Sequence, residues 1–138
     1  MTKVAMKTTV NASPEKAWDV LGDFNGLPRF VAAVSESVVR GSGVGAVRTL
    51  TLAGGGQIRE RLEAFDPDGR TLKYSILDGP LPVKNYLSTV RVTPTGDGRA
   101  DIFWSSTFEP SGAGEAEARQ AIEGVYQLGF DGLHKLFV

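Results

Sequence analysis

The chain has no cysteine, a single histidine and no long hydrophobic run. The missing cysteines exclude disulfides, thiolate zinc sites and cysteine nucleophiles, while one histidine rules out His-rich metal sites and argues against a Ser-His-Asp triad. We therefore expect neither a metal nor a cofactor. No segment approaches the length of a membrane-spanning helix and the N-terminus MTKVAMKTTV alternates, so we expect a cytoplasmic protein without stable membrane insertion.

A strong charge of either sign is also missing. Fifteen basic and sixteen acidic side chains give a net charge of −1, so no overall field favours a nucleic acid as a partner. A length of 138 residues with 41% hydrophobic residues suits one domain over residues 1–138 with a sizeable core.

Hydrophobic periodicity predicts an α+β fold. Residues 3–10 alternate as a strand, two short helical pieces follow around Ala17 and Phe30, and helical periodicity returns from Gly114 to the C-terminus. Between them lie six strand-like runs, at residues 34–40, 46–52, 57–65, 71–77, 84–93 and 100–108. Their short connections predict an antiparallel sheet of about seven strands packed on one long C-terminal helix.

The segment GSGVGAVRTLTL at residues 41–52 raises the question whether its glycines hold a phosphate. A dinucleotide fingerprint or a P-loop must lead into a helix, whereas this segment continues as a strand. The glycines are better explained by the positive φ angles of a turn between two strands. The segment therefore predicts a turn and no phosphate site.

Strand alternation places three polar side chains, Arg48, Glu60 and Tyr86, on inward faces. Their neighbours on the same faces are Leu50 and Leu52 for Arg48; Ile58, Leu62 and Ala64 for Glu60; and Ser88, Val90 and Val92 for Tyr86. The last strand adds the inward residues Ile102, Trp104, Ser106 and Phe108. Inward charges need partners, because a buried and unpaired charge is costly. Arg48 and Glu60 are therefore either a structural ion pair, or a misread register, or part of a polar cluster in a cavity that holds a ligand or water.

The C-terminal helix contains Gly124, Gly129 and Gly132, and glycine is unfavourable inside a helix. Gly129 lies within the apolar stripe formed with Ala118, Ile122, Val125, Leu133 and Leu136. Either a strand crosses the helix closely at Gly129, or space is left open there.

Several short motifs accompany this order of elements. They are SPEKAW at residues 13–18, a Gly-x-Gly-x-x-Arg turn ending at Arg48, Glu60-Arg61-Leu62 followed by Asp66, and Asn85-Tyr86 after Gly79-Pro80-Leu81-Pro82. Over residues 3–138 the chain thereby resembles the polyketide cyclase/dehydrase and lipid-transport group of the SRPBCC, or START-like, helix-grip superfamily, which includes the plant abscisic acid receptors and lachrymatory-factor synthase. The resemblance implies a sheet wrapped around a long C-terminal helix, with a hydrophobic cavity entered past loops at one end.

The resemblance and the inward residues imply binding or transport of a hydrophobic small molecule with a polar end. We expect its site to contain Arg48, Leu50, Glu60, Leu62, Tyr74, Tyr86, Ser88, Trp104, Ser106, Ile122, Val125 and Gly129. The resemblance also implies gate loops containing Gly54, Gly55, Gly56, Pro80, Leu81 and Pro82. These loops lack the receptors' own gate and latch sequences, so hormone signalling is not implied.

Two other functions stay open. In a metal-free cyclase, dehydratase or lyase, Glu60 would move a proton, Arg48 would stabilise an oxyanion and Tyr86 would orient the substrate or donate a proton. In a protein-interaction module, the helix or the gate loops would contact a partner, with His134 on that surface. The expected partner is a hydrophobic small molecule, and a homodimer is left open.

Overall fold

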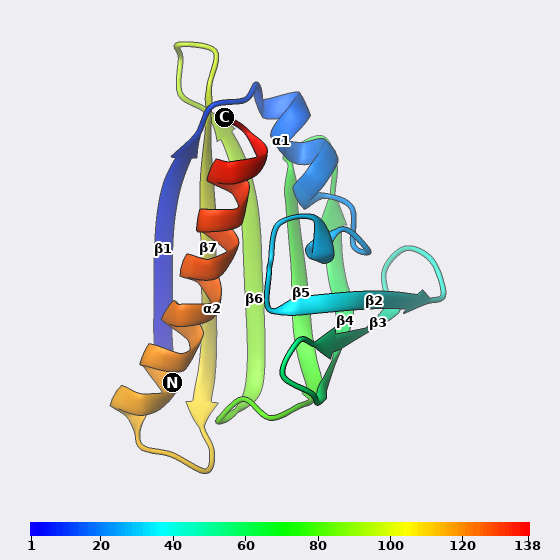
Figure 1. The fold of residues 1–138 in the computed structure, drawn as a ribbon, viewed down its shortest axis with the longest axis vertical. Coiled ribbons are helices and arrows are strands. Elements are labelled where there is room, and N and C mark those ends of the chain that lie inside the picture. Colours follow the sequence, from blue (N-terminus) through cyan, green and yellow to red (C-terminus); the bar gives the residue numbers. More distant parts are fainter.

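The fold is an antiparallel sheet of seven strands with a long C-terminal helix, as the computed structural model of residues 1–138 shows (Figure 1). Its elements are β1 (Thr2–Val10), α1 (Pro14–Leu21), the 3-10 helix η1 (Leu27–Arg29), β2 (Val34–Arg40), β3 (Val47–Leu52), β4 (Gln57–Asp66), β5 (Thr71–Asp78), β6 (Val83–Pro94), β7 (Ala100–Pro110) and α2 (Glu115–Leu136). The strands lie in the order β1-β7-β6-β5-β4-β3-β2. This confirms the predicted α+β, helix-grip architecture.

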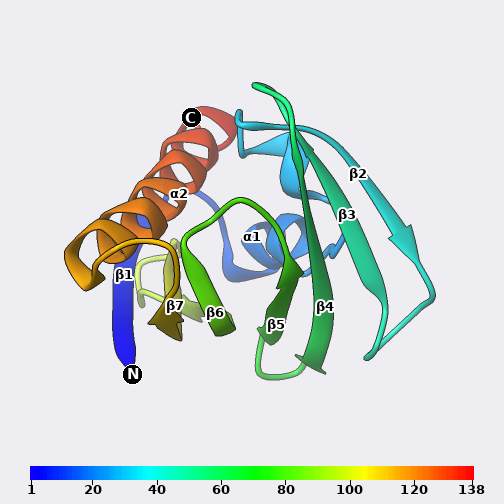
Figure 2. The same ribbon diagram turned by 90° about the horizontal axis from the view of Figure 1, so that it is seen from below.

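The sheet bends around its helices. Figure 2 shows α1 and α2 on the concave side of the sheet, where most of the apolar residues of the strands are buried. The first strand pairs with the last one, β1 with β7, while β2 to β7 follow one another as a meander. The core therefore lies between the concave face and the two helices.

Local sequence signals explain the helix near the N-terminus. The Ser13 hydroxyl accepts a hydrogen bond from the backbone N–H of Lys16 at 3.2 Å, and Pro14 occupies the first helical turn, where its missing N–H has no consequence. The helix ends at Leu21. The second predicted helical piece is only the 3-10 turn η1, in which the Phe30 N–H donates to the carbonyl oxygen of Leu27 at 3.1 Å.

The glycine-rich segment before β3 is a turn, as predicted. Gly41, Gly43 and Gly45 have φ angles of 87°, 67° and 95°, which side chains with a Cβ rarely adopt. The segment connects β2 to β3 and leads into no helix. The structure therefore lacks the strand-to-helix geometry that a phosphate loop requires.

A bulge in β4 changes which of its residues face inward. The pairing of β4 with β5 shifts between Leu62 and Ala64, so that Ala64 lies opposite the exposed Lys73. Phe65 then turns to the concave side and stacks on Trp18 of α1, with the ring centroids 5.7 Å apart. The prediction that Ala64 shares the inward face was wrong, because a bulge reverses the alternation beyond it.

The buried stripe of α2 also differs from the predicted one. It consists of Ala118, Ile122, Tyr126, Gly129, Phe130 and Leu133. Val125 is half-buried and Leu136 is exposed, because the stripe passes through Tyr126 and Phe130 instead. None of the helices combines the length and the apolar character that a membrane crossing requires.

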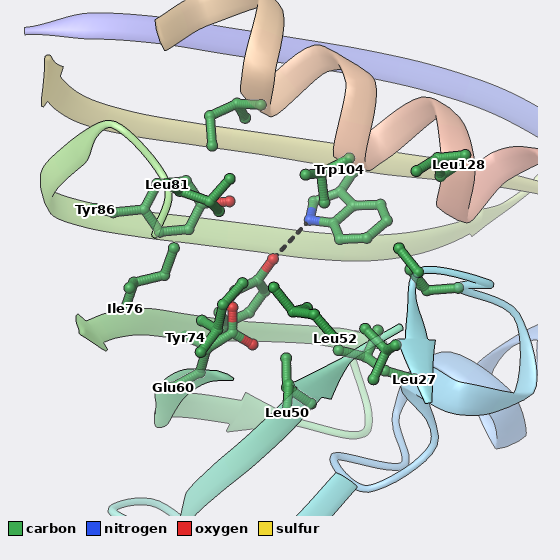
Figure 3. Close-up of a pocket in the computed structure, with 16 residues that line it drawn as sticks. Leu27, Leu50, Leu52, Glu60, Tyr74, Ile76, Leu81, Tyr86, Trp104 and Leu128 are labelled. Atoms are coloured by element: carbon green, nitrogen blue, oxygen red, sulfur yellow. Dashed lines mark hydrogen bonds between the residues drawn. The ribbon is translucent and has the colours of Figure 1, made fainter. Parts of the chain in front are cut away.

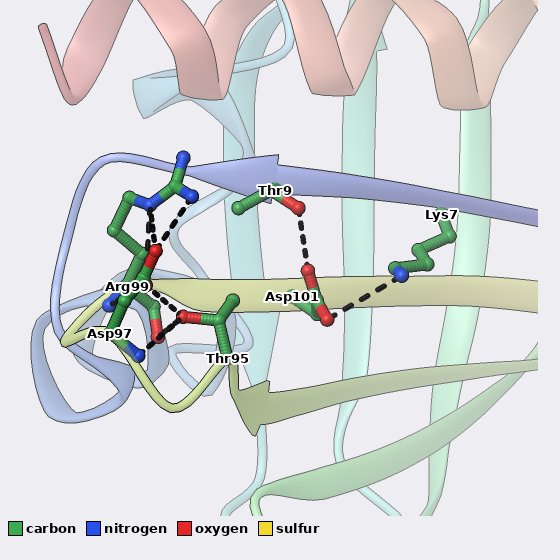
Figure 4. A network of polar contacts seen from close by, with 6 residues as sticks. All are labelled: Lys7, Thr9, Thr95, Asp97, Arg99 and Asp101. Carbon is green, nitrogen blue, oxygen red and sulfur yellow. Dashed lines mark hydrogen bonds and ion pairs between the residues drawn. The ribbon is translucent and has the colours of Figure 1, made fainter.

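Polar contacts join β1 and β7 on the outer face of the sheet (Figure 4). Asp101 accepts a hydrogen bond from the Thr9 hydroxyl at 2.6 Å and lies 3.5 Å from Lys7 Nζ. In the hairpin before β7, Arg99 Nη2 lies 2.8 Å from Asp97 Oδ2. The Asp97–Arg99 pair is about half exposed, as is Lys7, which marks this face as the solvated one, and such exposed charges contribute little to stability.

Candidate functional site

An apolar pocket lies on the concave side of the sheet, between the central strands and α2 (Figure 3). Its volume is about 70 Å³, and 15 of its 16 lining residues are hydrophobic. The one charged residue on its wall is Glu60. This pocket is the candidate site because it combines an apolar wall with one charged group.

The structure brings many of the expected site residues to this wall. The expected residues that line the pocket are Leu50, Glu60, Tyr74, Tyr86, Trp104, Ile122, Val125 and, from the loop before β6, Leu81. The expected residues that do not line it are Arg48, Leu62, Ser88, Ser106, Gly129, Gly54, Gly55, Gly56, Pro80 and Pro82.

Arg48 and Glu60 are adjacent because β3 and β4 pair in a register that places them directly opposite each other. Arg48 Nε donates to Glu60 Oε1 at 2.8 Å, and Arg48 Nη2 lies 2.7 Å from the same oxygen. Both side chains are almost fully buried, with 4% and 7% of their surfaces exposed. The predicted inward orientation of both residues is therefore what the structure has.

Arg48 does not line the pocket and is held by other contacts. Its third nitrogen, Nη1, donates to the backbone carbonyl of Phe24 at 3.0 Å. The guanidinium carbon lies 4.2 Å from the centroid of the Phe24 ring and 4.8 Å from that of Tyr74. Every nitrogen thus has a partner, and aromatic rings pack against the guanidinium. In this arrangement Arg48 does not line the pocket, so the ligand-binding and oxyanion roles expected for it stay predictions.

Glu60 has one engaged and one free oxygen. Oε1 takes both contacts from Arg48, whereas Oε2 makes no hydrogen bond to the protein. Burial raises the pKa of the Glu60 carboxyl, and the charge and hydrogen bond of Arg48 oppose this rise. Of the two residues of the ion pair, Glu60 is therefore the one that lines the pocket.

Aromatic and hydroxyl groups form a buried network beside the pocket. Trp104 Nε1 donates to Tyr74 Oη and to Ser88 Oγ, each at 3.1 Å (Figure 3 shows the bond to Tyr74). Tyr86 Oη lies 2.5 Å from Tyr126 Oη, which lies 3.1 Å from Ser88 Oγ. Burial raises the pKa of the Tyr74, Tyr86 and Tyr126 hydroxyls, so all three stay protonated near neutral pH.

Sequence reasoning missed Tyr126, which is fully buried on the inner face of α2. Its ring stacks on Trp104, with the centroids 4.4 Å apart, and its hydroxyl joins Tyr86 to Ser88. The helical pattern fits either Val125 or Tyr126, one position apart. The cluster of inward hydroxyls on β6 was the signal that could have favoured the tyrosine.

Two of the three glycines of α2 are sites of close crossing. A Cβ on Gly129 would lie 2.5 Å from the Trp104 ring, and one on Gly132 would lie 1.5 Å from the carbonyl oxygen of Phe30. Of the two alternatives for Gly129, the structure has the close crossing of β7 and no open space. Gly124 is exposed and has no such neighbour.

The two expected gate loops lie at the same end of the sheet, since β3–β4 and β5–β6 are alternate turns of one meander. The three glycines, Gly54 to Gly56, are exposed, and Gly55 and Gly56 have positive φ angles of 95° and 91°. Leu52 before the first loop and Leu81 within the second both line the pocket. Movement of these loops remains a prediction.

A curved antiparallel sheet closed by a long C-terminal helix, with an apolar pocket between them, defines a helix-grip protein of the START-like class. The chain matches the family described as "Polyketide cyclase / dehydrase and lipid transport" over residues 1–138. The chain belongs to this family.

Related proteins come from bacteria and plants. The structure superposes on that of XoxI from Bacillus cereus with a TM-score of 0.93 and 35% identity, over 99% of this chain and 96% of that one. A protein from Thermobifida fusca gives a TM-score of 0.87 at 27% identity, over 99% and 93% of the two chains. The MLP-like protein 423 of Arabidopsis thaliana is 29% identical over 115 residues, 75% of this chain and 74% of the plant protein.

Proposed function

We propose that the protein binds or carries a mostly apolar small molecule with one polar end, held between the sheet and α2. The observation that carries this proposal is the wall of the pocket, where apolar side chains surround a single carboxylate. Binding sites for small molecules have this composition, in which apolar contacts supply affinity and a few polar groups orient the ligand. Membership of a family described by lipid transport supports the same function.

The size of the pocket indicates what binding requires. Its volume of about 70 Å³ is well below the roughly 300–1,000 Å³ of typical ligand sites. Leu52, Leu81 and Leu128 lie on its wall without being fully buried, and Leu128 has 45% of its surface exposed. We therefore infer that a ligand enters by displacing these side chains, with the glycine loop at residues 53–56 and the proline loop at 79–82 as the segments that yield.

The test uses a neutral apolar dye, N-phenylnaphthylamine, whose fluorescence rises in apolar surroundings. Val125→Phe would place a ring into the pocket from the half-buried position on α2, and we expect at least about a tenfold loss of dye affinity. Val38→Phe is the matched control, since Val38 is 47% exposed on β2 and does not line the pocket. Equal dye binding by both variants, or none by the wild type, would contradict the proposal.

Native mass spectrometry of freshly purified protein gives a second measurement. A ligand retained from the cell would appear as a fixed mass added to the chain, and the same spectrum would report whether the protein is a monomer or the homodimer left open above. Val125→Phe should lose the added mass while Val38→Phe keeps it.

The free oxygen of Glu60 favours a second candidate function, proton transfer in a metal-free cyclase, dehydratase or lyase. A buried carboxyl with a raised pKa suits general acid–base catalysis, and Oε2 is available to a bound molecule. The structure supports neither an oxyanion role for Arg48 nor a free donor role for Tyr86, whose hydroxyl contacts Tyr126. Conversion of the retained compound by the wild type, with binding but no conversion by Glu60→Gln, would establish this function over that of a carrier.

A further inference from the structure

The polar groups on the pocket wall can be assigned as donors or acceptors by following the protons of the buried network. Ser88 Oγ donates to the backbone carbonyl of Ser105 at 3.0 Å, so it can only accept from Tyr126. Tyr126 therefore donates to Ser88 and accepts from Tyr86. The hydroxyl proton of Tyr86 is thus donated to Tyr126, while the Tyr86 oxygen can still accept a hydrogen bond.

Tyr74, unlike Tyr86, has a hydroxyl proton that it can still donate. An indole N–H can only donate, so Tyr74 Oη accepts from Trp104 Nε1. Trp104 Nε1 has one proton, which it shares between Tyr74 and Ser88, and this is the one hydrogen bond that the Tyr74 hydroxyl makes. The Tyr74 proton therefore has no acceptor within the protein. Tyr74 is thus the wall group with a proton to donate.

Glu60 supplies the acceptor beside it. Glu60 lies opposite Ile76 in the pairing of β4 with β5, and Tyr74 lies two residues further along the same face of β5. Figure 3 shows the two side chains pointing into the pocket next to each other. A free carboxylate oxygen and a free phenolic proton therefore face the same region.

The charge of this region is already balanced. Arg48 and Glu60 form a buried pair of zero net charge, and Arg48 is sealed by Phe24 and Tyr74. A ligand carboxylate would meet the like charge of Glu60 without reaching Arg48. A ligand ammonium would leave one positive charge uncompensated in an apolar site, which is costly.

We propose, on the basis of the binding function above, that the pocket selects a neutral molecule whose polar end is a hydroxyl. The hydroxyl donates to Glu60 Oε2 and accepts from the Tyr74 hydroxyl, so both free wall groups are matched. Carboxylates and amines with the same carbon frame are rejected. This specificity is opposite to that of a site in which a cation faces the ligand.

The experiment compares matched probes: octanol, octanoate, octylamine and methyl octyl ether, and the same four head groups on a cyclohexyl frame. Binding is followed by the indole N–H signals in nuclear magnetic resonance spectra. Trp104 reports on the pocket, and the second tryptophan of the chain, Trp18, does not line it and is the internal control. At about pH 8 the acid is ionised and the amine is protonated.

In the wild type we expect the alcohol to bind at least about tenfold more tightly than the carboxylate and the amine. The ether accepts from Tyr74 but cannot donate to Glu60, so its affinity should lie several-fold below that of the alcohol. Tyr74→Phe should lower the affinity for the alcohol to a value close to the affinity for the ether.

Glu60→Gln gives the sharpest test, because it leaves the positive charge of Arg48 uncompensated. Octanoate should then bind more tightly than octanol, reversing the wild-type order. If the Gln variant does not fold, the wild-type order and Tyr74→Phe still decide the proposal.

The outcomes distinguish failure of the hydroxyl selectivity from failure of the binding function itself. Equal affinity for all head groups, or preference of the wild type for the carboxylate or the amine, would overturn the hydroxyl proposal and leave the binding function standing. If no probe on either frame shifts the Trp104 signal and the neutral dye does not bind, both fail.

Discussion

Two of the arginine–carboxylate pairs of strand β4 lie on its opposite faces and involve the adjacent residues Arg59 and Glu60. On the outer face Arg59 Nε donates to Asp78 Oδ2 at 2.8 Å, and about half of each side chain is exposed, 49% and 54%. On the inner face Glu60 pairs with Arg48, and both are almost fully buried. The two pairs have nearly the same chemistry and the same distance of 2.8 Å from Nε to the carboxylate, and they differ in their contact with water.

The difference in solvation reverses the net direction of the pKa shift of the carboxyl group. The hydrogen bond from Arg59 lowers the pKa of Asp78, because no large desolvation cost opposes it. Desolvation raises the pKa of Glu60 in spite of Arg48. A buried pair is thus poor evidence for stability and better evidence for a site, since its cost must be balanced by another benefit.

The largest effect should come from breaking the inner pair on one side. Arg48→Met would leave Glu60 buried without a partner, and we expect the free energy of unfolding to fall by about 3–5 kcal/mol. Urea denaturation measures this loss. Arg59→Met is the matched control on the outer face, and an equal loss in both variants would remove the distinction between the two pairs.

Removing both inner charges should reverse most of that loss. In Arg48→Met/Glu60→Leu no charge remains in the core, and well-packed apolar replacements of buried pairs are often neutral or stabilising. The double variant should therefore be clearly more stable than Arg48→Met alone in the same urea experiment. A double variant that is no more stable than the single one would mean that packing around Arg48, and not the charge left on Glu60, causes the loss.

The pH dependence of stability should have opposite signs for the two carboxylates. The pKa of Glu60 is above its ordinary value of 4.5 in the folded state, so folding favours the protonated form. Relative to Glu60→Gln, the wild type should lose stability as the pH rises from about 4.5 through the folded-state pKa.

Asp78 should behave in the opposite way. Its pKa is below the ordinary value of 3.8, so relative to Asp78→Asn the wild type should lose stability as the pH falls below about 3.8. Melting curves of the wild type and both variants across this pH range measure the two differences. The same sign for both would contradict the assigned role of desolvation.

The smallest effect is expected for the outer pair at neutral pH. Exposed pairs are screened by salt and lose side-chain entropy on forming, so Asp78→Asn should melt close to the wild type, and added salt should reduce any remaining difference. A large, salt-independent loss would show that this pair is not merely a surface contact.

The strand pattern predicted most of the fold and part of the site. The inward positions of Arg48, Glu60 and Tyr86 follow from alternation, which is a local property of an extended chain. The prediction failed at Ala64 because the bulge in β4 depends on how β5 pairs with it, and the sequence of β4 alone does not contain that information.

The site was harder to predict where helix and sheet meet. The periodicity of α2 indicated a buried stripe but did not decide between Val125 and Tyr126, because the two positions differ by one step of the helix. Gly129 was recognised as unusual, yet its role depends on Trp104, which the fold brings against it. The volume of the pocket likewise depends on side chains from six strands, η1, α2 and two loops.

The sequence by itself determined the succession of strands and helices and the fact that Arg48 and Glu60 face inward, because periodicity and alternation are set by neighbouring residues. Only the tertiary structure decided that Arg48 is sealed by Phe24 and Tyr74 while Glu60 reaches the pocket. These contacts join residues up to 26 positions apart along the chain, between Arg48 and Tyr74. Which groups cover a side chain is a property of the packed fold, and that packing is what gives one member of the ion pair access to a ligand and denies it to the other.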